Sequence, residues 1–109
     1  GMDDRFFRYS ADTGAEGIVF EAMGVGNIPP DAFKGVKYAR SKNIPMVLVS
    51  RCPTGETLDI YSYPGAGKWI KEAGVIFTDY LNGQKARIKF MLALGLTKDP
   101  DKLKSIFED

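Results

Sequence analysis

The residues best placed to do chemistry follow two short apolar segments that have the composition of buried strands. Residues 24–27, Gly-Val-Gly-Asn, come soon after the apolar residues 18–20, and Arg51 follows the apolar run at 44–50. Two glycines two apart allow backbone conformations that are closed to other residues. Asn27 beside such backbone can orient a carboxylate or an amide, or it can bond its own backbone as a turn residue. An arginine can hold a carboxylate through two parallel hydrogen bonds. Together these residues indicate a site for a small polar ligand.

The polar residues around Arg51 also have structural interpretations. Arg51 can pair with Asp59 or Glu56 and stabilise its own loop. Tyr61 can line a pocket or an interface, or pack loosely on the surface. Cys52 has no base near it in the sequence, so we expect an inert, buried thiol. Both interpretations of Arg51 and of Tyr61 remain open at this point.

A further charged residue lies on the first apolar segment. Glu21 follows residues 18–20 on the same predicted strand. A buried carboxylate needs a partner, so the sequence predicts a structural ion pair there.

The glycine segment also suggests a dinucleotide site, but the spacing argues against one. The third glycine of a G-x-G-x-x-G motif would fall at position 29, which is Pro29. Pro29 and Pro30 also lack the backbone donors that hold a pyrophosphate. A structural turn is therefore the better interpretation.

Two residue types limit the chemistry of the chain. Histidine is absent and there is one cysteine among 109 residues. A Ser-His-Asp or Cys-His mechanism cannot be assembled from this chain alone, and a zinc site lacks its usual ligands. A single cysteine permits no internal disulfide, which is typical of a reducing compartment and favours a cytoplasmic location.

Composition and charge indicate one ordinary globular domain. The formal charge is +1, from 15 basic and 14 acidic residues, and gives no reason to expect nucleic acid or a membrane surface as a partner. No apolar run approaches the ~20 residues of a membrane span, and no signal sequence is recognised. Residues 1–2 have the form of a tag remnant before a start methionine, which leaves residues 3–109 as a single domain.

Apolar periodicity and end signals predict the elements of this domain. Helices are expected near 5–12, from Asp31 to about 42, at 68–72, at 82–94 with Gly95 as its end, and from Pro100 onward. Strands are expected at 18–20, 44–50 and 75–77, with a brief edge strand at 58–61. Asn82 and Asp99 are expected as helix caps.

This alternation of helix and strand indicates an α/β fold. We expect three α/β/α layers around a small, mostly parallel sheet, as in Rossmann-like and flavodoxin-like domains. Right-handed crossovers would bring the segments after the three strands to one edge of the sheet. The predicted polar site lies at that edge.

Four segments in order resemble the C-terminal domain of bacterial L-asparaginases of the asparaginase/glutaminase family. They are GVGN at 24–27, PMVLVSR with PTG at 45–55, LNGQKARIK at 81–89, and the tail from Thr97 to Phe107. The resemblance spans nearly the whole chain, and its departures are more similar to the cytosolic type of enzyme. In some members a second asparagine follows the first by two positions and binds substrate, but here that position is Pro29.

The resemblance implies a domain whose catalytic threonine lies elsewhere, in an N-terminal domain of the same protein. No catalytic residue is then expected in this chain, and neither a metal nor an organic cofactor is implied. The implied role is to complete an active site for L-asparagine and to form subunit contacts in a homo-oligomer, often a dimer. Asn27, Arg51, Asp59 and Tyr61 are the candidate substrate-binding residues. The alternative is a freestanding α/β module that binds an amino acid or a nucleotide.

Overall fold

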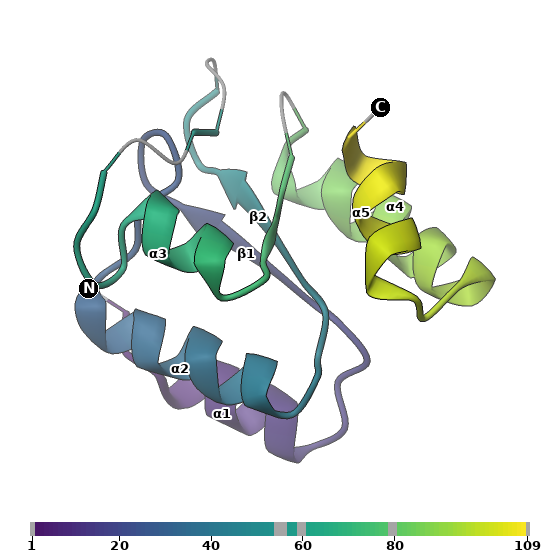
Figure 1. The fold of residues 1–109 in the computed structure, drawn as a ribbon, viewed down its shortest axis with the longest axis horizontal. Coiled ribbons are helices and arrows are strands. Elements are labelled where there is room, and N and C mark those ends of the chain that lie inside the picture. Colours follow the sequence, from purple (N-terminus) through teal and green to yellow (C-terminus); the bar gives the residue numbers. More distant parts are fainter. Residues whose placement is uncertain (1, 54–56, 59–60, 79–80, 109) are drawn as a thin grey trace.

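The computed structural model describes residues 2–53, 57–58, 61–78 and 81–108, and within them helices and strands alternate along the chain. The elements, shown in Figure 1, are α1 (Arg5–Asp12), β1 (Ile18–Ala22), α2 (Pro30–Ser41), β2 (Met46–Ser50), α3 (Gly67–Glu72), β3 (Ile76–Phe77), α4 (Gly83–Leu96) and α5 (Pro100–Glu108).

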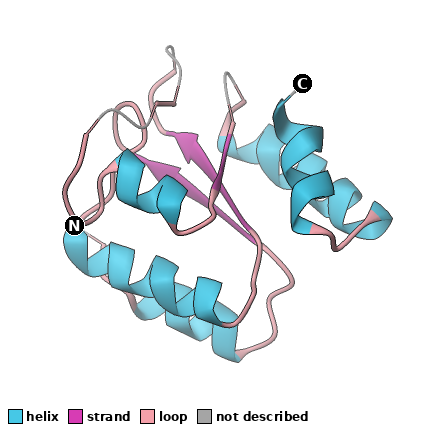
Figure 2. Cartoon of the chain, in the orientation of Figure 1, coloured by secondary structure: helices cyan, strands magenta, loops and turns pink. Residues whose placement is uncertain are grey.

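The strands form one parallel sheet with β2 in the middle. The order is β1-β2-β3, with Val19 beside Val47 and Leu48 beside Phe77. Because all three strands run the same way, as the arrows of β1 and β2 show in Figure 2, their carboxyl ends meet at one edge. The predicted parallel sheet is confirmed.

The central strand explains the three layers. Successive side chains of a strand point to opposite faces, and every residue from 46 to 49 is fully buried. Met46 and Leu48 join the core under α1, α2 and α3, whereas Val47 and Val49 join the core under α4 and α5. Figure 1 shows α1 and α2 on one side of the sheet and α4 and α5 on the other. The predicted α/β/α architecture is therefore confirmed.

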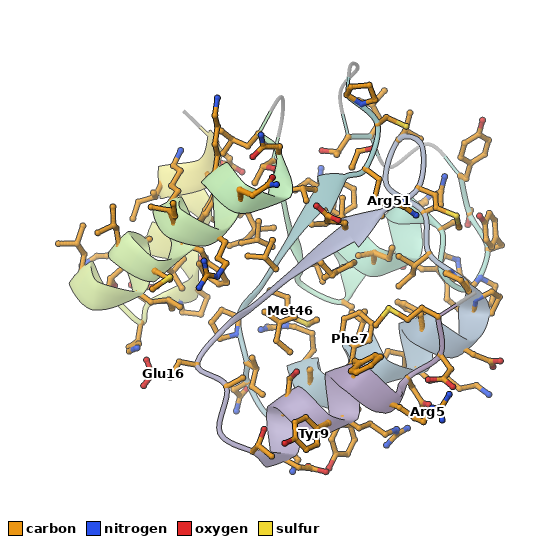
Figure 3. All side chains as sticks on the ribbon, turned by 180° about the vertical axis from the view of Figure 1, so that it is seen from behind. Arg5, Phe7, Tyr9, Glu16, Met46 and Arg51 are labelled. Atoms are coloured by element: carbon orange, nitrogen blue, oxygen red, sulfur yellow. The ribbon has the colours of Figure 1, made fainter. Side chains whose placement is uncertain are left out.

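Close packing of α1 on α2 explains a glycine inside a helix. A Cβ on Gly35 would lie 2.7 Å from the Cβ of Phe7. Phe7 in turn meets Phe20 of β1 edge to face, with ring centroids 5.4 Å apart. Figure 3 shows Phe7 pointing from α1 into the molecule, while Tyr9 lies on the outer side of the same helix. The lost helix propensity at Gly35 thus permits the approach of Phe7.

Two predicted helix caps are confirmed. The side chain of Asn82 accepts a hydrogen bond from the backbone N–H of Lys85 at 2.9 Å. At the start of α5, Asp99 Oδ1 accepts from the backbone N–H of Asp101 at 3.0 Å.

Two predicted helix ends are wrong. Asp31 does not cap α2, because the helix begins one residue earlier at Pro30, whose fixed φ suits the first helical position. Gly95 does not end α4, which continues to Leu96, and the N–H of Thr97 still bonds Ala93 O at 3.0 Å. A glycine ends a helix through a positive φ, and Gly95 is not among the residues with that conformation.

The predicted edge strand at 58–61 falls partly outside the described residues, and Leu58 and Tyr61 are not in a strand. Leu58 instead donates its backbone N–H to Val25 O at 2.7 Å, which ties this segment to the glycine loop. In the described part of the chain, no helix is both long and apolar enough to span a bilayer.

Candidate functional site

The glycine segment after β1 folds back on itself as a tight loop. Met23 and Asn27 exchange backbone hydrogen bonds, each of 2.9 Å, across Gly24, Val25 and Gly26. Gly24 has φ +56° and Gly26 has φ +123°, and the second value is strongly disfavoured for any residue with a Cβ. The loop is therefore fixed by its own backbone at the carboxyl edge of the sheet.

Ser50 joins this loop to the end of the central strand. Its hydroxyl donates a hydrogen bond to Gly24 O and accepts one from the backbone N–H of Cys52 at 3.0 Å. The backbone N–H of Arg51 bonds Ala22 O at 2.8 Å, which continues the ladder between β1 and β2. The position of Arg51 is thus set by backbone contacts on both of its sides.

Asn27 makes a tertiary contact. Its Oδ1 accepts a hydrogen bond of 3.1 Å from the backbone N–H of Gly67, the first residue of α3. The next residue, Ile28, donates its N–H to Gly65 O at 2.7 Å. This half-buried asparagine therefore fixes the start of α3 against the glycine loop, a role different from that of an asparagine bonding its own turn.

A polar pocket of about 440 Å³ opens beside these loops. It lies between the ends of β1 and β2 and the start of α4. Its lining residues are Glu21, Ser50, Arg51, Cys52, Pro53, Thr57, Thr78, Leu81, Asn82, Gly83 and Gln84. Arg51 and Glu21 bring one charge of each sign to its walls, and both are exposed. Such a pocket suits a small ligand that carries both charges, or a carboxylate alone.

Glu21 lies against the first turn of α4. The carboxylate occupies the space that a Cβ on Gly83 would need. A carboxylate at a helix N-terminus is stabilised by the unpaired backbone N–H groups and the helix dipole. The expected burial of Glu21 is wrong because the pocket opens its side chain to solvent.

The threonines of the pocket hold structure together. Buried Thr57 donates its hydroxyl to Thr78 O at 2.7 Å, and buried Thr78 directs its own hydroxyl at Leu48 O at 3.4 Å. Cys52, in contrast, is exposed, so the expectation of a buried thiol is wrong. Its place beyond the last residue of β2 puts it at the mouth of the pocket.

The candidate substrate-binding residues fall on two sides of the glycine loop. Arg51 lines the polar pocket with Glu21, and Figure 3 shows it where the central strands end. Asn27 and Tyr61 are not among its lining residues and instead contact the start of α3; Tyr61 O accepts the N–H of Lys68 at 3.3 Å. The fourth candidate, Asp59, lies outside the described residues. Within the described residues, no three cysteine or carboxylate side chains are placed to hold a metal ion.

The fold and this edge define an open, parallel α/β domain with a polar site beyond the carboxyl ends of its strands, the usual place for a ligand in such sheets. Residues 1–107 match the family model of the glutaminase/asparaginase C-terminal domain. The chain belongs to this family.

Individual relatives agree with the family assignment. Over 93 residues the chain is 33% identical to a probable L-asparaginase of Deinococcus radiodurans, covering 85% of this chain and 28% of that protein. Over 100 residues it is 32% identical to a glutamyl-tRNA(Gln) amidotransferase subunit of Methanobrevibacter smithii, covering 91% of this chain and 22% of that protein. The thermostable L-asparaginase of Thermococcus kodakarensis superposes with a TM-score of 0.85 at 28% identity, over 100% of this chain and 33% of that one. The chain thus spans about a quarter to a third of these proteins.

Proposed function

We propose that this chain acts as the C-terminal domain of an L-asparaginase, which hydrolyses L-asparagine to L-aspartate and ammonia. The observation that carries the proposal is the family match over residues 1–107, in a chain that spans only about a quarter of its asparaginase relatives. The catalytic threonine is assigned to the N-terminal domain of the same protein. It attacks the side-chain amide of asparagine, ammonia leaves, and water then hydrolyses the threonine ester.

This chain would complete the site rather than perform the reaction. Asn27, Arg51, Asp59 and Tyr61 are proposed to contact substrate from the carboxyl edge of the sheet. An exposed guanidinium beside a carboxylate matches a substrate that carries both an α-carboxylate and an α-amino group. We also assign the parent to a homo-oligomer in the cytoplasm, and residues 3–109 to one domain. The family match does not favour the alternative of a freestanding binding module.

Ammonia release from L-asparagine tests the proposal. The chain alone should release none, because it lacks histidine and its buried threonine hydroxyls are directed at backbone carbonyls. The same chain mixed with the upstream part of its protein, or the intact parent, should release ammonia. Activity from the 109 residues alone, or an intact parent that is inactive on asparagine, would overturn the proposal.

A second candidate follows from the amidotransferase relatives. Four of the relatives similar to this chain are named as subunits of a glutamyl-tRNA(Gln) amidotransferase. If the parent belongs with them, ammonia release should depend on glutamyl-tRNA, whereas an asparaginase needs no tRNA. The same assay with and without glutamyl-tRNA separates the two.

A further inference from the structure

The outer face of α4 is apolar although it faces solvent. Toward the sheet the helix buries Ala86, Phe90 and Ala93. On the other side four large apolar side chains are exposed, to 57%, 59%, 69% and 83% in the order Ile88, Met91, Leu92 and Leu96. A surface helix normally has a polar outer face.

These four residues form one continuous stripe. Their spacings of three, one and four residues place them on one side of an α-helix. Gly95 lies on the same side, and a Cβ there would meet nothing within 4 Å. A glycine inside a helix lowers its stability by about 1 kcal/mol relative to alanine, and here it leaves room for another backbone to approach. Contiguous apolar patches mark interaction surfaces, whereas single exposed apolar residues are common.

The charges at the two ends of the stripe are complementary to each other. α4 carries Lys85, Arg87 and Lys89 and no acidic residue. Just beyond its C-terminal end lie Asp99 and Asp101, and Asp101 lines a surface groove of about 490 Å³ together with Leu96. The stripe therefore begins at a basic end and finishes at an acidic one.

A second copy of the chain, turned by a two-fold rotation, matches both the apolar and the charged parts of this pattern. With the helices antiparallel and centred on Leu92, Ile88 lies opposite Leu96 of the partner subunit. Lys85 then lies near Asp99 of the partner subunit and close to Asp101 of the partner subunit, and symmetry repeats each contact.

We propose that the stripe Ile88, Met91, Leu92 and Leu96 is the contact through which two copies of this chain associate, with Leu92 next to the two-fold axis. The inference rests on the homo-oligomer assigned in the proposed function, and it adds the surface and the geometry. The patch is small beside stable interfaces, which bury about 800 Å² per partner. The 109-residue chain should therefore form a concentration-dependent dimer.

A charge-swap experiment at Leu92 tests the geometry. Sedimentation equilibrium from micromolar to millimolar concentration should show the unmodified chain approaching twice its monomer mass. Leu92→Glu and Leu92→Lys should each weaken association on the order of tenfold or more, because like charges meet at the axis. An equimolar mixture of the two variants should dimerise again, since glutamate then meets lysine. Phe6→Glu is the matched control: it is 72% exposed on α1, across the sheet from α4, and should leave association unchanged.

Three results would overturn the proposal. They are an unmodified chain that stays monomeric at millimolar concentration, a dimer that survives both Leu92 variants, and a mixture that does not reassociate. The first would leave α4 to another partner, such as the rest of the parent protein. Circular dichroism of each variant verifies the fold. Because mass is measured rather than ammonia, the proposed reaction and this interface can fail independently.

Discussion

Arg51 combines a fixed backbone with a free side chain. Its N–H bonds Ala22 O at 2.8 Å, while its side chain lines the polar pocket. In the proposed parent enzyme, Arg51→Ala should raise KM for L-asparagine by about 10- to 100-fold, the loss of a hydrogen bond to a charged group. Arg51→Lys should recover only part of this affinity, because lysine cannot bind a carboxylate through two parallel bonds.

Steady-state ammonia release measures this change. Arg5→Ala is the matched control, because Arg5 pairs with Asp3 on α1, far from the pocket (Figure 3). If Arg51→Ala leaves both KM and kcat unchanged, Arg51 belongs to loop structure and not to substrate binding.

Gly65 differs from other glycines of positive φ because a backbone carbonyl approaches it. Its φ is +96°, and a Cβ there would collide with Ile28 O. Gly14 has a similar φ of +89° but open space around it. Gly14→Ala should therefore lower the free energy of unfolding by about 1–2 kcal/mol from backbone strain alone. Gly65→Ala should cost about 1–3 kcal/mol more, because the Ile28–Gly65 contact must open.

Urea denaturation of both variants gives the comparison. Equal losses at the two glycines would mean that the loop relaxes freely and that the contact with Ile28 contributes nothing.

Part of the candidate site could be predicted from the sequence and part could not. Gly24, Gly26 and Arg51 were found because they directly follow strands, and the ends of parallel strands share one edge. The contact from Asn27 to Gly67 joins residues forty positions apart, and no local pattern indicates it. The start of α4 was missed as a wall of the pocket, although a helix that follows a parallel strand begins at this same edge.

At the scale of elements, the predicted helix ends succeeded where one side chain decides them. Asn82 caps α4 through a bond within the same turn, so local sequence is sufficient. Pro29 and Pro30 precede Asp31, and the competition among these three to begin α2 was misjudged. Gly95 failed as a stop signal because helical backbone is open to glycine as well, and the surroundings decide which conformation it takes.

A polar cluster at the contact between α1 and α2 should make stability depend on pH. The Tyr38 hydroxyl donates to Asp12 Oδ1 at 2.5 Å, and Lys42 Nζ donates to the same oxygen at 2.9 Å. These bonds, that of Tyr38 first, hold the pKa of Asp12 below its ordinary value of 3.8. A carboxyl with a lowered pKa stabilises the fold fully above that ordinary value, and the contribution is lost as pH falls through the folded pKa.

Asp12→Asn should therefore be less stable than the unmodified chain at pH 7, and the difference should shrink below about pH 4. Thermal unfolding at a series of pH values measures it. Glu72→Gln, at the exposed end of α3, is the control and should show no comparable trend. A difference that stays constant down to about pH 2.5 would assign the effect to something other than ionisation of Asp12.

At the scale of the whole molecule, two apolar cores share one thin sheet. Trp69 packs against Phe33 on the side of α2 and α3, with ring centroids 6.0 Å apart. Leu103 is fully buried on the other side, with Phe90 and Phe107. Since β2 supplies Met46 and Leu48 to one core and Val47 and Val49 to the other, neither core is complete without it. We therefore expect the chain to unfold in a single step, as small domains usually do.

Leu103→Ala tests this coupling across the sheet. Removal of its buried methyl groups should lower the free energy of unfolding by about 2–5 kcal/mol, and Leu103→Met, which keeps the volume, by less than about 1.5 kcal/mol. Leu96→Ala, at an 83% exposed position, is the control and should change little at low protein concentration. Fluorescence of Trp69, the single tryptophan of the chain, reports the opposite core, and circular dichroism reports all the helices. Both midpoints should move together, because loss of α5 exposes Val47 and Val49 and so removes the support of the shared strand. If the circular dichroism midpoint falls while that of Trp69 stays in place, α4 and α5 unfold as a separate unit and the two cores are independent.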